Sequence, residues 1–79
     1  MRLDKYLKVS RIIKRRTVAN EACDAGRVIV NGKVARASYD VKVGDIIEIN
    51  MGKPVKVKVL NVTEYVTKET ASDQYTIIE

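Results

Sequence analysis

The sequence predicts a single α+β domain over residues 1–79, in which two N-terminal helices pack on a small antiparallel sheet. Three observations predict it: apolar residues recur at helical spacing over residues 1–25, a hairpin turn follows, and short valine-rich runs continue from there. Apolar residues make up 46% of the chain, enough to form a core. A domain of this length buries only about 60% of the surface of its unfolded chain, so we expect no deep catalytic cleft.

The first helix is expected to begin at Arg2 and to end or bend within residues 10–13. At about 100° per residue, four side chains fall in one arc that would face the core. These residues are Leu3, Tyr6, Leu7 and Ser10. The pattern then fails, because Ile12 would project among the cations and Lys14 into the apolar arc. Residues 14–16 are therefore expected to form a basic connection.

The second helix is expected over residues 18–25. Thr17 is a favourable N-cap, since its hydroxyl can accept a backbone N–H of the first turn. Gly26 follows at the position where helices commonly exit through a left-handed residue. The expected buried face is rich in alanine and comprises Val18, Ala19, Ala22, Cys23 and Ala25. The opposite face is polar or acidic and comprises Asn20, Glu21 and Asp24.

A β-hairpin is expected next, with strands at 28–30 and 33–35. The Asn-Gly pair at 31–32 between them supplies the two positive φ angles that a type I′ turn requires. Residues 41–49 then contain a turn at 44–45 that leads into another strand. These segments predict an antiparallel sheet.

The remaining residues are expected to complete the sheet. Valine alternates with lysine over residues 55–59, the period of a half-exposed strand. Pro54 stands at its start, where a missing N–H does least harm. Residues 63–74 are polar and predict only a short helix or loop, and residues 75–78 predict a last strand.

Positive charge is concentrated in the N-terminal half. The chain has 15 Lys and Arg against 10 Asp and Glu, a net charge of +5. Residues 1–36 hold ten cations and three anions, a net +7, whereas residues 37–79 hold five and seven, a net −2. This asymmetry predicts that the N-terminal half faces a polyanion. The alternative is charge that serves solubility alone.

Composition argues against an enzyme or a metal protein. The chain has no His, which removes the usual general base and the commonest metal ligand. Its glycines match neither a P-loop nor a dinucleotide fingerprint. Cys23 has no activating partner and is expected to be a core residue. We therefore predict no catalytic residue, no metal ligand and no cofactor.

The sequence also predicts ordinary roles for four acidic residues and a cytoplasmic location. The acids that could be imagined as carboxylate pairs are expected to be solvated or to cap turns; they are Asp4 with Asp45 and Glu48 with Glu64. The single cysteine excludes an internal disulfide and fits a reducing cytoplasm. Neither an apolar run of about 18 residues nor a signal-peptide core is present, so no membrane contact is expected.

The cationic cluster is the candidate functional site. Arg16 and Thr17 at a helix N-terminus would make a phosphate seat, since free N–H donors and positive potential meet there. The candidate RNA-binding residues are Arg2, Lys5, Arg11, Lys14, Arg15, Arg16 and Thr17. Secondary candidates are Lys8, Arg27, Lys33 and Arg36. An ordinary solvated helix face is the alternative interpretation.

The kind of nucleic acid follows from what surrounds these cations. A helix-turn-helix DNA reader needs a polar or basic recognition helix, whereas the second helix would expose Glu21 and Asp24. Single-strand readers stack bases on aromatic side chains, and only four Tyr are present. We therefore expect recognition of structured RNA by shape and phosphate contact.

Motifs at residues 2–7, 26–32 and 43–46, together with the basic turn ending at Thr17, resemble the alpha-L RNA-binding domain. That domain is named after the fourth protein of the small ribosomal subunit. The resemblance covers about residues 1–50, which leaves 51–79 as a strand extension. It implies RNA contacts on the two helices and on the turn between them.

Within that family, residues 1–5, 8–11, 14–17 and 75–77 resemble the bacterial ribosome quality-control factors called RqcP, and the resemblance extends over nearly the whole chain. It is similar, less closely, to the heat-shock proteins of fifteen kilodaltons. The resemblance implies a cytoplasmic, ribosome-associated, non-catalytic monomer that binds large-subunit rRNA and P-site peptidyl-tRNA and supports alanine tailing with the factor RqcH. It makes Arg2 and Arg16 the leading rRNA contacts.

Three alternatives stay open beside this interpretation. One is a generic binder of structured RNA, and another is a large-subunit recycling factor of the heat-shock type. The third is the RNA-binding module of a pseudouridine synthase.

Sequence reasoning also predicts that Arg16→Ala leaves the melting temperature nearly unchanged, because surface cations contribute little to stability.

Overall fold

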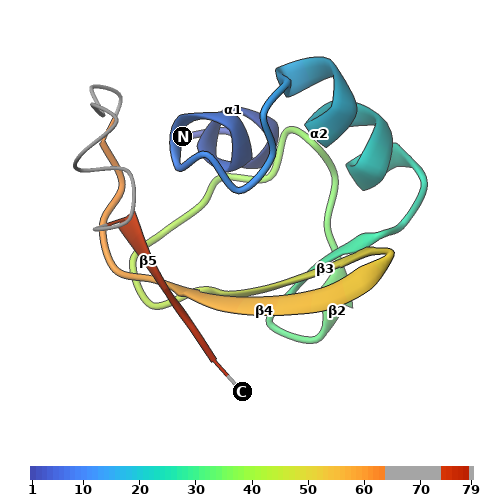
Figure 1. The fold of residues 1–79 in the computed structure, drawn as a ribbon. Coiled ribbons are helices and arrows are strands. Elements are labelled where there is room, and N and C mark those ends of the chain that lie inside the picture. Colours follow the sequence, from blue (N-terminus) through green and yellow to red (C-terminus); the bar gives the residue numbers. More distant parts are fainter. Residues whose placement is uncertain (64–73, 79) are drawn as a thin grey trace.

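Two short helices cover one face of a five-stranded antiparallel sheet (Figure 1). A computed structural model of the chain describes residues 1–63 and 74–78. The elements are α1 (Leu3–Val9), α2 (Arg16–Asp24), β1 (Val28–Val30), β2 (Lys33–Val34), β3 (Ile46–Met51), β4 (Lys53–Val59) and β5 (Tyr75–Ile77). The strand order is β2-β1-β3-β4-β5. The predicted α+β fold is confirmed.

Helix α1 is held at its start by backbone hydrogen bonds and at its end by a serine side chain. Its first N–H groups have no partner within the helix, so Leu3 donates to the Tyr39 carbonyl at 2.8 Å and Asp4 to the Ala37 carbonyl at 3.2 Å. The helix ends before Ser10, whose hydroxyl donates to the Tyr6 carbonyl at 2.7 Å. The predicted end within residues 10–13 is confirmed.

Helix α2 begins two residues earlier than predicted. Arg15 is the N-cap, without a side-chain hydrogen bond, and Arg16 is the first helical residue. The prediction of Thr17 as N-cap is therefore wrong. The physical reason lies in α1: Arg16 donates to the Asp4 carboxylate, and such a tertiary contact outweighs a capping preference of about 1 kcal/mol.

The exit of α2 follows its sequence signal. Gly26 has a φ of 73°, the left-handed conformation predicted for it. The N–H of Gly26 bonds to the Cys23 carbonyl and the N–H of Arg27 to the Ala22 carbonyl, both at 3.0 Å. This pair of bonds satisfies two carbonyls that the helix end would otherwise leave open.

The hairpin of β1 and β2 is confirmed by its turn. Asn31 and Gly32 have φ angles of 53° and 82°, as a type I′ turn requires. The Asn31 side chain then ties the hairpin to the next strand: its amide donates to Asp45 Oδ1 at 3.1 Å, and its oxygen accepts from the Ile46 N–H at 3.0 Å.

Strands β3, β4 and β5 follow the predicted runs. In the β3–β4 register Ile47 lies opposite Val57, and Pro54, the second residue of β4, lies opposite Asn50. Strand β5 pairs antiparallel with β4. Residues 64–73, which make up most of the polar segment 63–74, lie outside the described residues.

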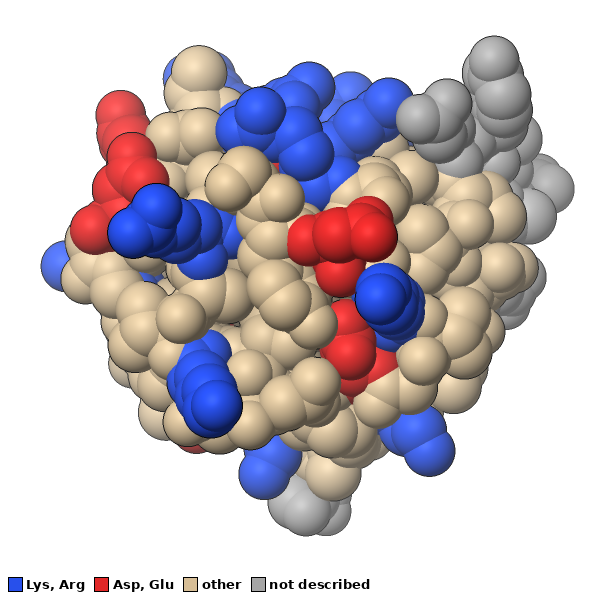
Figure 2. Space-filling model, turned by 180° about the vertical axis from the view of Figure 1, so that it is seen from behind, with Lys and Arg blue, Asp and Glu red and all other residues tan. Residues whose placement is uncertain are grey.

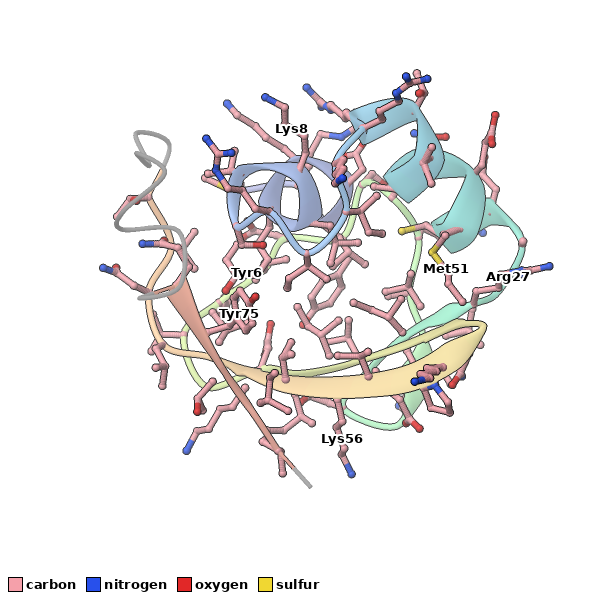
Figure 3. The ribbon with its side chains drawn as sticks, in the orientation of Figure 1. Tyr6, Lys8, Arg27, Met51, Lys56 and Tyr75 are labelled. Atoms are coloured by element: carbon pink, nitrogen blue, oxygen red, sulfur yellow. The ribbon has the colours of Figure 1, made fainter. Side chains whose placement is uncertain are left out.

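The core lies between the helices and the sheet. Its buried apolar residues include Leu3, Tyr6, Leu7, Ala19, Ala22, Cys23, Val28, Val30, Ile47, Ile49, Val57 and Val59. The Tyr6 hydroxyl donates to the Gln74 carbonyl at 2.6 Å, which joins α1 to the start of β5. Figure 3 shows the Tyr6 and Tyr75 side chains in the space between α1 and the sheet. The core therefore fixes α1 against the sheet and leaves its other face open.

Candidate RNA-binding surface

Lysines and arginines gather along the edge of the molecule that the two helices form, as Figure 2 shows from behind. Lys8, on α1, points away from the sheet in Figure 3. The exposed cations of α1, of the α1–α2 connection and of the start of α2 are Arg2, Lys8, Arg11, Lys14, Arg15 and Arg16. Lys5 is partly exposed. The structure thus brings the main sequence-predicted residues onto one layer.

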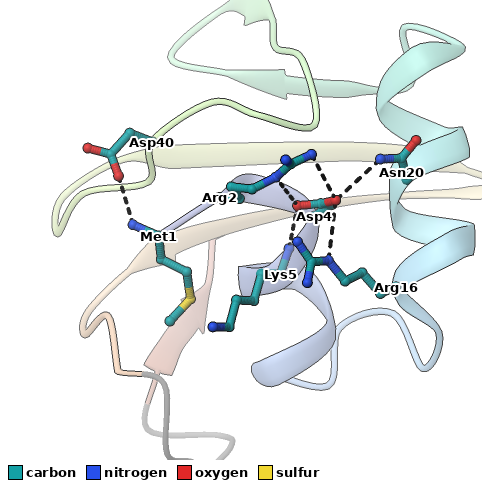
Figure 4. Close-up of polar contacts among 7 residues, drawn as sticks. All are labelled: Met1, Arg2, Asp4, Lys5, Arg16, Asn20 and Asp40. Carbon is teal, nitrogen blue, oxygen red and sulfur yellow. Dashed lines mark hydrogen bonds and ion pairs between the residues drawn. The ribbon is translucent and has the colours of Figure 1, made fainter.

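Asp4 of α1 is the centre of a polar cluster that joins the two helices (Figure 4). Its side chain is only 3% exposed. Arg2 Nε donates to Asp4 Oδ1 at 3.2 Å, and Arg16 Nε donates to Oδ2 at 3.4 Å. The Asn20 amide donates to Oδ2 at 3.3 Å and the Lys5 backbone N–H to Oδ1 at 2.8 Å. One carboxylate therefore organises groups from both helices.

The environment keeps this carboxylate ionised. Burial raises the pKa of Asp4, but the hydrogen bonds from its partners, led by Asn20, outweigh burial and leave the pKa below its ordinary value. Sequence reasoning expected a solvated or turn-capping Asp4, and that expectation is wrong. A signal was present, since Asp4 precedes the buried Leu7 by three positions and so borders the buried face of the helix.

Arg2 and Arg16 remain half exposed at the surface while they contact Asp4. Their side chains are 51% and 49% exposed. Arg2 makes a second, longer contact from Nη2 to Asp4 Oδ2 at 3.5 Å. Because a guanidinium carries five N–H donors, both arginines retain donors toward solvent.

The predicted phosphate seat is an open depression at the start of α2. It has a volume of about 360 Å³ and is lined by Asp4, Arg16, Thr17, Asn20 and Glu21. Thr17 is exposed in the first turn of the helix. The lining brings Arg16 and Thr17 together as predicted, but it also contains two acidic side chains that sequence reasoning did not place there.

The connection between α1 and α2 presents three further cations. Arg11, Lys14 and Arg15 are exposed, and within residues 1–63 and 74–78 none of them has an ion pair or side-chain hydrogen bond. Arg11 has a φ of 63°, a left-handed conformation that costs a non-glycine residue about 1 kcal/mol. The backbone there turns sharply and carries these cations to the edge of the molecule.

The secondary candidates do not all share this surface. Lys8 lies on α1, whereas Arg27 points away beyond the C-terminal end of α2 (Figure 3). Lys33 is on strand β2. Arg36 and Arg2 both line a second open depression, of about 570 Å³, between α2 and residues 34–38.

The thiol of Cys23 lies in the core of the fold. Cys23 is 3% exposed, as predicted for a core residue. Burial, with smaller contributions from Asp4 and Asp24, raises the pKa of its thiol to about 11, so it stays protonated at neutral pH.

Asp45 has the turn-capping role that sequence reasoning allowed. It accepts hydrogen bonds from the Tyr39 hydroxyl at 3.0 Å and from the Lys42 N–H at 2.9 Å, besides the one from Asn31. Asp45 and Asp4 share no partner among the described residues. Glu64, imagined as a partner of Glu48, lies outside the described residues.

In the described part of the chain, no group of His, Cys, Asp and Glu side chains lies close enough together to hold a metal ion. No helix among these residues is long and apolar enough to span a membrane.

Comparison with known proteins gives this geometry a family context. The S4 domain model matches residues 1–47. The RQC P-site tRNA stabilizing factor of Streptococcus pneumoniae is 58% identical over 79 residues, which cover 99% of this chain and 90% of that protein. An uncharacterized RNA pseudouridine synthase of Aquifex aeolicus is 51% identical over 59 residues, which cover 73% of this chain and 24% of that protein. The trimeric structure of Vibrio cholerae Heat Shock Protein 15 has a TM-score of 0.91 and 25% identity, covering 99% of this chain and 81% of that one.

Proposed function

This chain belongs to the S4 domain family and, within it, to the family of the RQC P-site tRNA stabilizing factors, and from that membership we propose how it acts. It binds large ribosomal subunits that are obstructed by peptidyl-tRNA and stabilises the P-site tRNA during ribosome quality control. In doing so it supports C-terminal alanine tailing of the stalled nascent chain. It performs this role in the cytoplasm, in association with the ribosome.

One observation carries the proposal. Identity of 58% extends over 99% of the chain to a protein named RQC P-site tRNA stabilizing factor. The similarity therefore includes residues beyond the matched S4 domain, which ends at residue 47. In this proposal the part of the chain after residue 50 extends the RNA-binding core, and β4 and β5 are its described strands.

The surface supplies the binding chemistry. Phosphates are contacted from one layer by Arg2 and Arg16, with Lys5, Arg11, Lys14, Arg15 and Thr17 as supporting contacts. Arginine suits this task because its planar fork can bind a phosphate through two N–H groups. The exposed acids of α2, Glu21 and Asp24, disfavour insertion of that helix into a DNA groove.

The protein does no bond chemistry in this proposal. It holds RNA elements in register while its partner, the tail-adding factor RqcH, delivers charged tRNA, and it acts as a monomer. The pseudouridine synthase alternative is less well supported, because identity to that relative is 51% over 59 residues, against 58% over 79 residues to the tRNA stabilizing factor. A uridine-isomerisation assay on purified protein tests the alternative directly, and no isomerised uridine is expected.

Sedimentation tests the proposal. A tagged form of the protein is fractionated from cells on a sucrose gradient, and enrichment with free large subunits is expected. A peak only at the top of the gradient would contradict the proposal. Loss of the enrichment on deletion of RqcH, with wild-type expression retained, would show that binding depends on that partner.

A further inference from the structure

We propose that Asp4 is a positioning residue, which holds Arg2 and Arg16 in the orientation that binds RNA phosphate. This role rests on the proposed RNA-binding function. Asp4 itself touches no RNA; it acts through the two guanidinium groups that it contacts. It is a buried acid within the cationic layer, and its charge has the wrong sign for a polyanion partner.

The charge and burial of Asp4 call for a local explanation. A negative charge beside a phosphate seat weakens phosphate binding through Coulomb repulsion. A buried carboxylate is also costly unless it is fully hydrogen-bonded. Asp4 is 2% exposed, and its two oxygens accept from Arg2, Arg16, Asn20 and the backbone. Asp4 thus repels phosphate and is costly to bury. Its presence is explained if it holds the guanidinium groups of Arg2 and Arg16 in an orientation that favours phosphate binding.

The contact geometry provides that improvement. Both arginines approach Asp4 through Nε, one at each carboxylate oxygen. For Arg16 this is the contact that its guanidinium makes within residues 1–63 and 74–78, so its two Nη groups are available to a phosphate. Arg2 precedes α1 and Arg16 begins α2. The carboxylate that they share therefore fixes the distance between their guanidinium groups.

Holding these side chains in advance strengthens binding. An arginine loses up to about 2 kcal/mol of rotamer entropy when it is immobilised. Side chains already held by Asp4 lose less of it when RNA binds. Lys8, Arg11, Lys14 and Arg15 have no such contact among the described residues, so they act as mobile charges.

The helix pair does not depend on Asp4 alone. The buried faces of α1 and α2 belong to one apolar cluster, which includes Leu3 and Leu7 from the first helix and Ala19 and Ala22 from the second. Asp4→Asn keeps the shape of the side chain and removes its charge. This variant is therefore expected to fold, with an altered hold on the two arginines.

The sign of the binding change separates positioning from net charge. Affinity for purified bacterial large ribosomal subunits is measured by anisotropy of the labelled protein, well below the melting temperature. Asp4→Asn is expected to weaken binding about tenfold, although one negative charge fewer would by itself strengthen it. The matched control is Asp24→Asn on α2, which removes an exposed charge that contacts no arginine in the described part of the chain. This variant is expected to bind as well as wild type or slightly better.

A double-mutant cycle tests whether Asp4 acts through the arginines. In an Arg2→Gln, Arg16→Gln background, Asp4→Asn is expected to change affinity by less than about twofold. An equal loss in both backgrounds would overturn the proposal, as would wild-type affinity for Asp4→Asn alone. If wild type itself fails to bind large subunits, the proposed function is what fails.

A measurement on wild type covers the case of a variant that does not fold. Nitrogen-15 NMR of arginine side chains reports how fast each Nε–H exchanges with water. The Nε–H groups of Arg2 and Arg16 are expected to exchange more slowly than that of Arg15, because both donate to a buried acceptor. Equal exchange rates for the three arginines would overturn the positioning role, whatever the protein binds.

Discussion

The helical layer and the sheet of this domain place their cations differently. On the sheet, cations face anions or neutral residues in the strand register: Lys56 of β4 lies opposite Glu48, and Lys58 lies opposite Ile46. On the helical layer, four exposed cations from Lys8 to Arg15 have no anionic partner among the described residues. The described strands carry four lysines and one glutamate, so positive charge is not confined to the helices. The helical layer differs in gathering its cations along one edge (Figure 2), and a polyanion is the partner that would balance them there.

The two layers also use their buried carboxylates differently. Asp45 accepts from neutral donors, namely Asn31, Tyr39 and the Lys42 backbone, and ties the hairpin to β3. Asp4 accepts from two half-exposed arginines. The same chemistry thus stabilises the fold in the sheet, whereas in the helical layer it arranges groups that face solvent.

Salt is expected to have the largest effect on binding. If four cations contact phosphates, the logarithm of RNA affinity falls with the logarithm of salt at a slope of about −3. Between about 50 and 200 mM salt this slope weakens binding about sixty-fold. Titrations with large subunits at several salt concentrations measure it, and a slope near zero would contradict the assignment of the helical layer to a polyanion.

A core variant of the sheet is expected to change stability and leave binding alone. Val57 of β4 is fully buried, so Val57→Ala should cost about 2 kcal/mol of unfolding free energy. In a domain of this size that corresponds to a fall in melting temperature of about 10 °C. Calorimetry measures the fall, and the salt slope of the folded variant serves as the control; a changed slope would mean that the layers are not independent.

A variant of the helical layer is expected to weaken RNA binding strongly and to change stability only slightly. Arg16→Ala should weaken binding to large subunits about tenfold, or about 1.4 kcal/mol. Because Arg16 contacts a buried carboxylate, some stability is lost too, under about 1 kcal/mol since the arginine is half exposed. Sequence reasoning predicts a nearly unchanged melting temperature for this variant, whereas the contact with Asp4 predicts a small fall.

The matched control for this variant is Lys56→Ala. Lys56 lies on the face of the sheet that the helices do not cover, and it points away from them (Figure 3). It should keep wild-type affinity within about twofold, because its charge is far from the helical layer. A loss as large as that of Arg16→Ala would move the binding surface to the sheet.

The pH dependence of stability gives the smallest effect. The pKa of Asp4 in the folded protein lies below its ordinary value, so the ionised carboxylate stabilises the fold above the unfolded pKa near 4. That stabilisation is lost as pH falls through the folded pKa. Urea unfolding between about pH 5 and 2 should therefore show a shallower loss of stability for Asp4→Asn than for wild type. Parallel curves would contradict the depressed pKa.

Local signals were sufficient for most of the fold. The Asn-Gly pair at 31–32 determines the hairpin, Gly26 determines the exit of α2, and the spacing of Leu3, Tyr6 and Leu7 determines the buried face of α1. Each is decided within a few residues by backbone conformation or side-chain period. The start of α2 was misjudged because its cause, Asp4, lies twelve residues away from Arg16.

The sequence by itself determined the element types, the uneven distribution of charge and the set of cations on the helices. Propensity, periodicity and net charge are properties of the chain and do not depend on packing. Only the tertiary structure decided which arginines contact a buried carboxylate and which cations have no such contact among the described residues. That distinction depends on the burial of Asp4 between two helices, where one carboxylate reaches Arg2, Arg16 and Asn20 together, and such convergence follows from packing rather than from neighbouring residues.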